Sequence, residues 1–243
     1  MPRSALRPCR LGSGTADVRV CSAIVDRVRH GYTNRTDRTR AGVRKIYEGP
    51  DARERARTEY VALTALSGRM PVPAVLERSD DALVIGFVAG THGQDEIEAG
   101  HGPKVLSACG ALLRRLHDLD PALVGSSHSA GVICHGDFGP NNVLLDCASY
   151  EVTALLDWEF SGVGEAIVDI AWCEWIVRMH HAAAVEFLPA FFDAYGVRPP
   201  WPSRHQAMLD RCRWLEAFSR RANAAGAVRL WQERGRVTAE WAG

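Results

Sequence analysis

Ile133–Asp146 reads ICHGDFGPNNVLLD, and Leu155–Glu159, one short hairpin later, reads LLDWE. These two segments place a carboxylate, Asp137, in a turn-rich loop and an amide, Asn142, five positions further on. A second carboxylate, Asp157, ends the apolar run of the second segment. Glycine, proline and asparagine around Asp137 are typical of a turn. The pattern therefore predicts polar oxygen atoms gathered where short strands end.

Phosphoryl transfer is a reaction that needs these side chains together. The transferred group passes through a loose transition state with dispersed charge, so the protein mainly positions reactants and neutralises charge. We predict that Asp137 is catalytic, orienting an acceptor hydroxyl and taking its proton. Asn142 and Asp157 are the predicted magnesium ligands, because Mg²⁺ prefers oxygen donors. Each could instead be an ordinary turn or strand-end residue.

The scarcity of lysine indicates a second part of the site. Lysine occurs only at Lys45 and Lys104, whereas arginine is used elsewhere. Lysine acts on phosphates as a compact point charge, which suggests a phosphate contact for Lys45 on a strand over residues 42–47. Glu59 in the following helix is the predicted ion-pair partner. Arg44 is the alternative if the register is shifted by one, and solvated side chains are the simpler alternative.

The His-x-Asp-x-x-x-x-Asn arrangement from His135 to Asn142, followed by Asp-Trp-Glu at 157–159, resembles the aminoglycoside phosphotransferase and choline kinase family. The resemblance covers about residues 25–175. It implies an α+β, two-lobed protein-kinase-like fold, with a small antiparallel-sheet N-terminal lobe carrying one helix and a mostly helical C-terminal lobe. It also implies ATP and magnesium as cofactors and a small hydroxylated molecule as the acceptor, cationic acceptors included.

The same resemblance assigns roles to further residues. Lys45 corresponds to the lysine that contacts the α- and β-phosphates. Thr33 and Asn34 lie where the family places a nucleotide-covering loop, so they are predicted to face the nucleotide. An ordinary hairpin turn over residues 30–36 fits that stretch equally well.

Residues around the central motif are expected to be structural. His135 and Asp169 correspond to family residues that support the catalytic loop. Glu159 and Glu165 are expected to be surface or loop residues.

Periodicity and turn residues give the order of elements. The predicted strands cover residues 18–28, 42–47, 72–76 and 83–88. One helix begins at 51, a glycine-containing hinge covers 89–93, and helices are predicted after Pro103 and over 166–179, 182–195 and 203–225. We expect a tail over 1–17, a nucleotide-binding lobe over 18–90, and a catalytic and substrate-binding lobe over 91–243.

Composition limits the remaining possibilities. The formal net charge of zero argues against a general partner of nucleic acid or anionic membranes. No apolar run approaches the roughly 18 residues of a membrane span, and residues 1–16 lack the apolar core of a secretory signal. The seven cysteines include no C-x-x-C pair. Reduced thiols in the cytoplasm are therefore the simplest expectation.

Substrate identity stays open at the level of sequence. Acidic residues in the C-terminal helices would suit a cationic antibiotic, although such residues also serve solubility; they are Glu174, Glu186, Asp193, Asp210 and Glu216. An aromatic cage would suit a choline-like amine, although tryptophans at helical spacing usually form core; the candidates are Trp172, Trp175, Trp201 and Trp214.

Two other functions compete with phosphoryl transfer. One is a kinase-like nucleotide-binding module with weak or no catalysis. The other is a metal-dependent hydrolase that uses His135, Asp137 and Asp157 with His180 and His181 nearby. Adjacent histidines on a helix diverge by about 100°, so those two do not readily share a metal.

Overall fold

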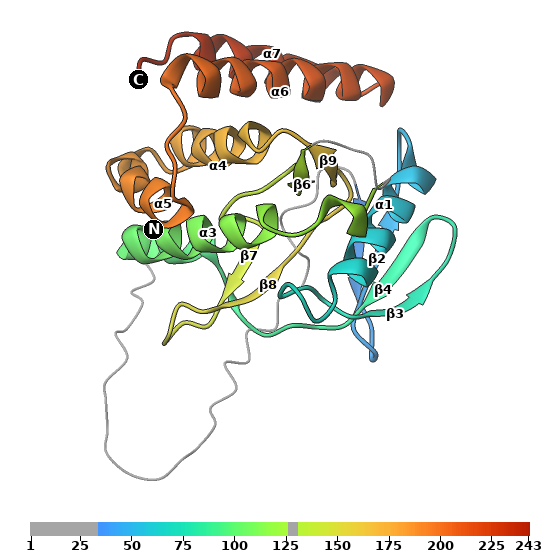
Figure 1. The fold of residues 1–243 in the computed structure, drawn as a ribbon. Coiled ribbons are helices and arrows are strands. Elements are labelled where there is room, and N and C mark those ends of the chain that lie inside the picture. The colour runs from blue at the N-terminus through green and yellow to red at the C-terminus, as the bar shows by residue number, and fades with distance from the viewer. Residues whose placement is uncertain (1–33, 126–130) are drawn as a thin grey trace, which may run out of the picture.

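The structure is a computed structural model that describes residues 34–125 and 131–243. The predicted tail over 1–17, the strand predicted over 18–28 and Thr33 lie outside these residues. The described part has the expected α+β architecture, with a small antiparallel sheet joined to a mostly helical remainder (Figure 1).

The N-terminal sheet has four antiparallel strands in the order β1-β2-β4-β3. Their bounds are β1 Asn34–Arg38, β2 Val43–Tyr47, β3 Val75–Arg78 and β4 Ala82–Ile85. The single helix α1, Ala52–Leu66, buries Ala56, Leu63 and Leu66 in the main core. Sequence reasoning expected a turn over 30–36, but Asn34–Thr36 pair with Tyr47–Lys45. Pairing with β2 explains the difference, because the strand pair provides hydrogen bonds for the backbone N–H and C=O groups of these polar residues.

Two smaller sheets carry the central motif. The order β5-β7-β8 joins β5 Thr91–His92, β7 Val143–Leu145 and β8 Val152–Leu155. The third sheet pairs β6 Val132–Cys134 with β9 Gly162–Gly164. The predicted catalytic loop, which carries Asp137, therefore runs from β6 to β7, and the second motif follows β8.

The glycines of the predicted hinge have a packing role. A Cβ at Gly90 would lie 2.6 Å from Thr153 Oγ1, and one at Gly93 would lie 2.9 Å from Pro140 O. Neither glycine has a positive φ. Close approach of the backbone, rather than an unusual backbone angle, explains glycine at these positions.

The C-terminal part is built from helices. Their bounds are α2 Gly93–Glu96, the π-helix η1 Ile97–His101, α3 Gly102–His117, the 3₁₀-helix η2 Pro121–Leu123, α4 Ile167–His180, the 3₁₀-helix η3 Ala182–Phe187, α5 Leu188–Tyr195, α6 Trp201–Arg221 and α7 Ala225–Ala239. Helix α3 packs against α5, and α4 packs against α6. Helices α6 and α7 lie side by side as an outer layer over α4 (Figure 1).

Two helix boundaries differ from the sequence-based expectation. The helix predicted over 182–195 is divided into η3 and α5, and Pro189 occupies the first turn of α5. Proline lacks an N–H and suits a helix start rather than an interior. The helix predicted over 203–225 ends at Arg221, and α7 follows as a separate helix.

One hydrophobic core connects the two parts of the molecule. Leu63, Leu66 and Leu83 of the N-terminal part belong to the same buried cluster as Leu113, Leu155 and Trp158. A second cluster between α4 and α6 contains Trp172, Trp175 and Met208. Burial of these side chains fixes the position of the β8 end relative to the N-terminal sheet.

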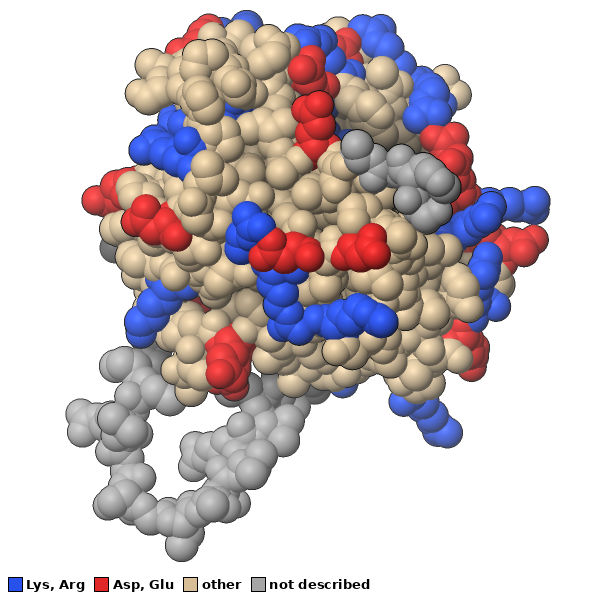
Figure 2. All heavy atoms as spheres, viewed as in Figure 1, with Lys and Arg blue, Asp and Glu red and all other residues tan. Residues whose placement is uncertain are grey.

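The exposed surface carries both signs of charge. On the face shown in Figure 2, basic and acidic side chains are interspersed, as the zero net charge suggests. Within residues 34–125 and 131–243, none of the helices combines the length and apolarity that crossing a bilayer requires.

Gly110 tests the packing of α3 on α5. A Cβ there would lie 2.2 Å from the Phe191 carbonyl oxygen. We expect Gly110→Ala to lower the free energy of unfolding by about 1–3 kcal/mol, although alanine is the better helix former. Urea denaturation measures the change. In the control Gly226→Ala the added Cβ meets nothing within 4 Å, so stability should be unchanged or rise by up to about 1 kcal/mol. Equal effects of the two substitutions would contradict the packing of α3 on α5.

Candidate active site

The catalytic loop is held from below by a buried carboxylate. Asp169, in the first turn of α4, accepts hydrogen bonds from the backbone N–H of His135 (2.7 Å) and of Gly136 (2.8 Å). His117 Nε2 lies 3.2 Å from the same carboxylate. The supporting position predicted for Asp169 is thus confirmed, and both of its oxygens fix the start of the loop.

His135 supports the loop from inside. Its ring is fully buried, its Nδ1 accepts from the Asp137 N–H (3.2 Å), and its Nε2 lies 2.8 Å from Leu156 O. The imidazole therefore accepts at Nδ1 and donates at Nε2. This confirms the scaffold position predicted for His135 and ties the loop to the strand end before Asp157.

Gly136 has a backbone that other residues rarely adopt. Its φ is +81°, and a Cβ would lie 2.2 Å from the Phe160 carbonyl oxygen. The loop crosses the Phe160 backbone so closely that only glycine fits.

Asp137 lies between two side-chain donors. The indole N–H of Trp172 donates to Oδ1 at 2.7 Å, and Asn142 Nδ2 donates to Oδ2 at 3.1 Å. Burial raises the pKa of Asp137, while Arg211 and the Trp172 hydrogen bond oppose that rise. A carboxylate that is buried, oriented and raised in pKa is suited to accept a proton.

Asn142 and Asp157 meet at the strand ends. The Asn142 amide nitrogen also donates to the Asp137 carbonyl oxygen (2.8 Å), so the amide oxygen is the atom of this side chain that can bind a cation. The Leu156 N–H donates to Asn142 O at 2.8 Å and so aligns the residue before Asp157. Asp157 has a φ of +69°, a conformation that concentrates at functional sites.

An ammonium group from the N-terminal sheet reaches this point. Lys45 Nζ donates to Glu59 Oε2 at 2.6 Å and contacts Asp157 Oδ1, with Glu159 Oε2 at 3.7 Å. Tyr47 OH donates to Glu59 Oε2 at 2.6 Å. The ion pair predicted between Lys45 and Glu59 is therefore present. Arg44, the alternative, is exposed on the opposite face of β2.

Glu159 belongs to the same cluster. It is 3% exposed and accepts hydrogen bonds from Asn34 Nδ2 (2.6 Å) and Arg55 Nη1 (2.9 Å). Glu159 lies in a turn, as expected of a surface or loop residue, but its side chain is buried, because two cations and an amide offset the burial of this carboxylate. Lys45, Arg55, Glu59, Asp157 and Glu159 are called the Lys45 cluster below.

Asn34 is thus placed beside the cluster. Its amide oxygen accepts from Arg55 Nη1 at 3.0 Å, and its nitrogen is held by Glu159. Its predicted contact with the nucleotide remains a prediction.

The charges of the cluster shift one another's pKa. Burial alone would lower the pKa of Lys45, but Asp157, Glu59 and Glu159 together raise it. Burial would raise the pKa of Asp157, but Lys45 overcomes this and lowers it. Burial raises the pKa of Glu159 despite Lys45 and Arg55. Lys45 and Asp157 are therefore charged near neutral pH, as phosphate and metal binding require.

The donor set fits a hard divalent cation. Carboxylate oxygens of Glu59, Asp157 and Glu159 lie within 4.8 Å of one another and share the Lys45 ammonium group; of these side chains Asp157, at 31%, is the exposed one and so is open to a metal. Asn142 adds an amide oxygen. Carboxylate and amide oxygens with room for water are the ligands that Mg²⁺ prefers.

A model of the phosphotransferase enzyme family matches residues 25–131 and 126–215. The chain belongs to this phosphotransferase family. No curated protein matches it by sequence.

Solved structures resemble the fold of this phosphotransferase at low sequence identity. The gentamicin complex of APH(2")-IIa is 13% identical with a TM-score of 0.64, over 84% of this chain and 88% of that chain. The GDP and kanamycin complex of APH(2")-IIia is 11% identical with a TM-score of 0.69, over 87% and 91%. The macrolide 2'-phosphotransferase MphH from Brachybacterium faecium is 17% identical with a TM-score of 0.53, over 88% and 94%. Together they confirm the protein-kinase-like fold.

The hydrolase alternative finds no support among the described residues of the phosphotransferase. The groups of His, Cys, Asp and Glu able to share a metal are Glu59 with Asp157 and Glu159, and His117 with Cys134 and Asp169. In the second group, the pKa of Cys134 is raised to about 12, chiefly by burial, so its thiol stays protonated. His135, Asp137 and Asp157 do not form such a group.

The acidic residues considered for a cationic substrate are largely paired with arginine. Glu174 is buried between Arg178 (2.9 Å) and Arg204. Asp210 contacts Arg213, and Glu216 lies 2.5 Å from Arg220. Trp172 and Trp175 stack on each other at 4.3 Å within the second core cluster. These pairings leave little free negative charge on α4 and α6 for a polycation.

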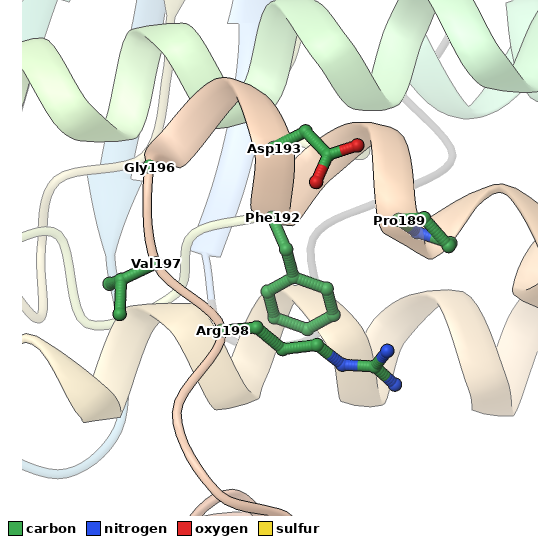
Figure 3. Close-up of a pocket in the computed structure, with 6 residues that line it drawn as sticks. All are labelled: Pro189, Phe192, Asp193, Gly196, Val197 and Arg198. Atoms are coloured by element: carbon green, nitrogen blue, oxygen red, sulfur yellow. The ribbon is translucent and has the colours of Figure 1, made fainter.

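A shallow hollow on the surface of the phosphotransferase lies at the end of α5, outside the catalytic loop and the Lys45 cluster (Figure 3). Its lining residues are Pro189, Phe192, Asp193, Gly196, Val197 and Arg198. Asp193, one of the acids considered above, therefore faces this hollow rather than Asp137.

Sequence reasoning missed two residues of the site. Arg55 lies four positions before Glu59 in α1, on the same helical face, so helical periodicity could have placed it beside the cluster. Trp172 had been considered only for an aromatic cage or core. Its hydrogen bond to Asp137 depends on how α4 meets the catalytic loop, which local sequence does not encode.

Arg55 tests the electrostatics of the Lys45 cluster. Arg55→Met leaves buried Glu159 without its nearest cation, so we expect a loss of about 3–5 kcal/mol in unfolding free energy near neutral pH. Arg55 lowers the pKa of Glu159, so its contribution exists while Glu159 is ionised and is lost as pH falls. Denaturation between about pH 8 and about pH 5 should show the loss shrinking. Arg57→Met, exposed on the same helix, is the control and should change little. A pH-independent loss would contradict the pairing.

Proposed function

We propose that this chain is an ATP- and Mg²⁺-dependent phosphotransferase that phosphorylates a hydroxyl group of a small molecule. The observation that carries the proposal is the arrangement of Asp137, Asn142 and Asp157 at two strand ends. Asn142 is hydrogen-bonded to Asp137 and to Leu156, the residue before Asp157, and Lys45 contacts Asp157. Phosphoryl transfer needs a base for the acceptor hydroxyl, oxygen ligands for the metal and a cation for the phosphates. These residues can fill all three roles.

Asp137 is the proposed catalytic residue. Its Oδ1 and Oδ2 are each oriented by a donor, so the carboxylate can hold an acceptor hydroxyl in a fixed direction. As the hydroxyl oxygen bonds to phosphorus, its proton passes to Asp137 and the bond to the leaving phosphate oxygen breaks. The burial that raises the pKa of Asp137 makes it a better proton acceptor.

Lys45 is the proposed phosphate-binding residue. Glu59 holds the ammonium group from the α1 side, and Glu159 lies beyond hydrogen-bond distance. The two residues proposed to hold magnesium are Asn142 and Asp157, and the metal would neutralise phosphate charge there. Asn34 and Thr33 are the proposed nucleotide-covering residues.

Asp137→Asn tests the catalytic proposal. The substitution keeps the shape but removes the base, so we expect kcat for ATP-dependent phosphorylation to fall about 10²–10⁴-fold. A panel of hydroxylated amines, aminoglycosides, macrolides and hydroxy acids would supply the acceptor. Asp80→Asn, exposed between β3 and β4, is the matched control and should retain full activity.

Binding and catalysis are separated in the same experiment. Mg²⁺-ATP should raise the melting temperature of both wild type and Asp137→Asn, since a ligand of the folded state stabilises it. A nucleotide-dependent shift with no transfer in wild type to any acceptor would favour the binding module without catalysis. Full transfer by Asp137→Asn would overturn the role of Asp137.

Substitution of Trp172 tests how its hydrogen bond sets the pKa of Asp137. The indole hydrogen bond lowers the pKa of Asp137, whereas burial raises it. Trp172→Phe removes the donor, so the pKa should rise and the acid limb of the kcat/KM profile should move to higher pH. Trp175→Phe, at the stacking partner, is the control and should leave the limb in place. An unmoved limb in Trp172→Phe would contradict the assignment of Asp137 as the base.

A further inference from the structure

Arg211 of α6 has a buried guanidinium edge without a partner. Its Nε and Nη2 are buried, and neither has a hydrogen-bond acceptor within the part of the chain that the structure describes. The N–H bonds of Nε and Nη2 lie in the guanidinium plane and form one of its edges. This edge can donate to both oxygens of a carboxylate or phosphate.

Among residues 34–125 and 131–243, the arginines that are buried as whole residues are paired. Arg55 donates to Glu159, and Arg204 donates to Glu174. Leaving a buried donor unsatisfied costs free energy, so an arginine kept in that state suggests a ligand.

Three aromatic rings surround this guanidinium. Its Cζ lies 4.2 Å from the ring centre of Trp214, 5.3 Å from Phe160 and 5.7 Å from Trp172. Trp214 is 39% exposed, so one ring of this group lies at the molecular surface. The rings attract the charge of the guanidinium without accepting hydrogen bonds from its Nε and Nη2 donors.

The same rings bring Arg211 beside the catalytic carboxylate. Trp172 contacts Arg211 with its face and donates its indole N–H to Asp137 at 2.7 Å. Burial lowers the pKa of Arg211, and the nearby charge of Asp137 is the largest opposing influence. Arg211 thus approaches Asp137 from a helix of the C-terminal part, whereas Lys45 approaches the site from the N-terminal sheet.

We propose that Arg211 binds an oxyanion carried by the acceptor, so that the substrate is an alcohol bearing a carboxylate or a phosphate group. This inference rests on the proposed phosphotransferase function and narrows its substrate class. A polycationic acceptor would be repelled by the unpaired guanidinium beside Asp137. The arginine pairing of Glu174, Asp210 and Glu216 fits an anionic acceptor for the same reason.

Three matched alcohols test the proposal. Phenyllactate carries a hydroxyl and a carboxylate, 3-phenyl-1,2-propanediol replaces the carboxylate with an alcohol, and phenylalaninol carries an amine. Binding is measured by calorimetry and by tryptophan fluorescence, without any turnover. We expect wild type to bind phenyllactate at least about tenfold more tightly than the other two, since a charge-assisted bidentate pair is worth at least that ratio.

Variants assign the preference to the residue. Arg211→Gln should remove the preference for phenyllactate, and Arg211→Lys should restore only part of it. Arg213→Gln, an exposed arginine two positions later that contacts Asp210, should behave as wild type. The melting temperature of Arg211→Gln without ligand should equal or exceed that of wild type, because an unpaired buried charge is removed.

The outcomes that overturn the proposal are distinct. Equal binding of the three alcohols by wild type, or a preference that survives Arg211→Gln, would refute an acceptor oxyanion at Arg211. Weaker Mg²⁺-ADP binding in Arg211→Gln with unchanged phenyllactate binding would assign Arg211 to the nucleotide phosphates instead. Tight phenyllactate binding without phosphate transfer to any acceptor would refute the phosphotransferase function while leaving the role of Arg211 intact.

Discussion

The contact between Lys45 of β2 and Asp157 after β8 joins the N-terminal sheet to the second sequence motif. Most other features of the site depend on it. Glu59 and Tyr47 hold the lysine from one side, and Asn142 and His135 align the strand end from the other. A buried ion pair gains little stability over an apolar pair, so its presence here is better explained by function.

The charges of the site are divided between two environments. The Lys45 cluster has three carboxylates for two cations, and that excess of negative charge suits a divalent metal. Asp137 is held by the Trp172 indole and the Asn142 amide, and burial raises its pKa although the charge of Arg211 and the indole hydrogen bond oppose the rise. The carboxylates proposed for metal binding and for proton transfer therefore have pKa values shifted in opposite directions, as Asp157 and Asp137 illustrate.

The resemblance of the sequence to a phosphotransferase family implied the fold class and the role of Asp169, and the order and spacing of Lys45 and Glu59 predicted their pairing. The pairing of Lys45 with Glu59 and the support of the loop by Asp169 are both present. Contacts between distant segments were missed: neither the Trp172 bond to Asp137 nor the unpaired Arg211 edge was foreseen. These depend on how α4 and α6 pack beside the catalytic loop, which no local pattern encodes. The prediction of one undivided helix over 182–195 was wrong for a local reason, because Pro189 favours the start of a new helix.

A double-mutant cycle of Lys45→Met and Asp157→Asn, read as the free energy of unfolding, tests the connection between the two sequence motifs most directly. Contacting charges in a buried network should give a coupling energy of about 0.5–3 kcal/mol, with the double variant losing less than the sum of the single losses. Additivity within about 0.3–0.5 kcal/mol would contradict the account, because it would mean that the lysine and the aspartate do not share one site.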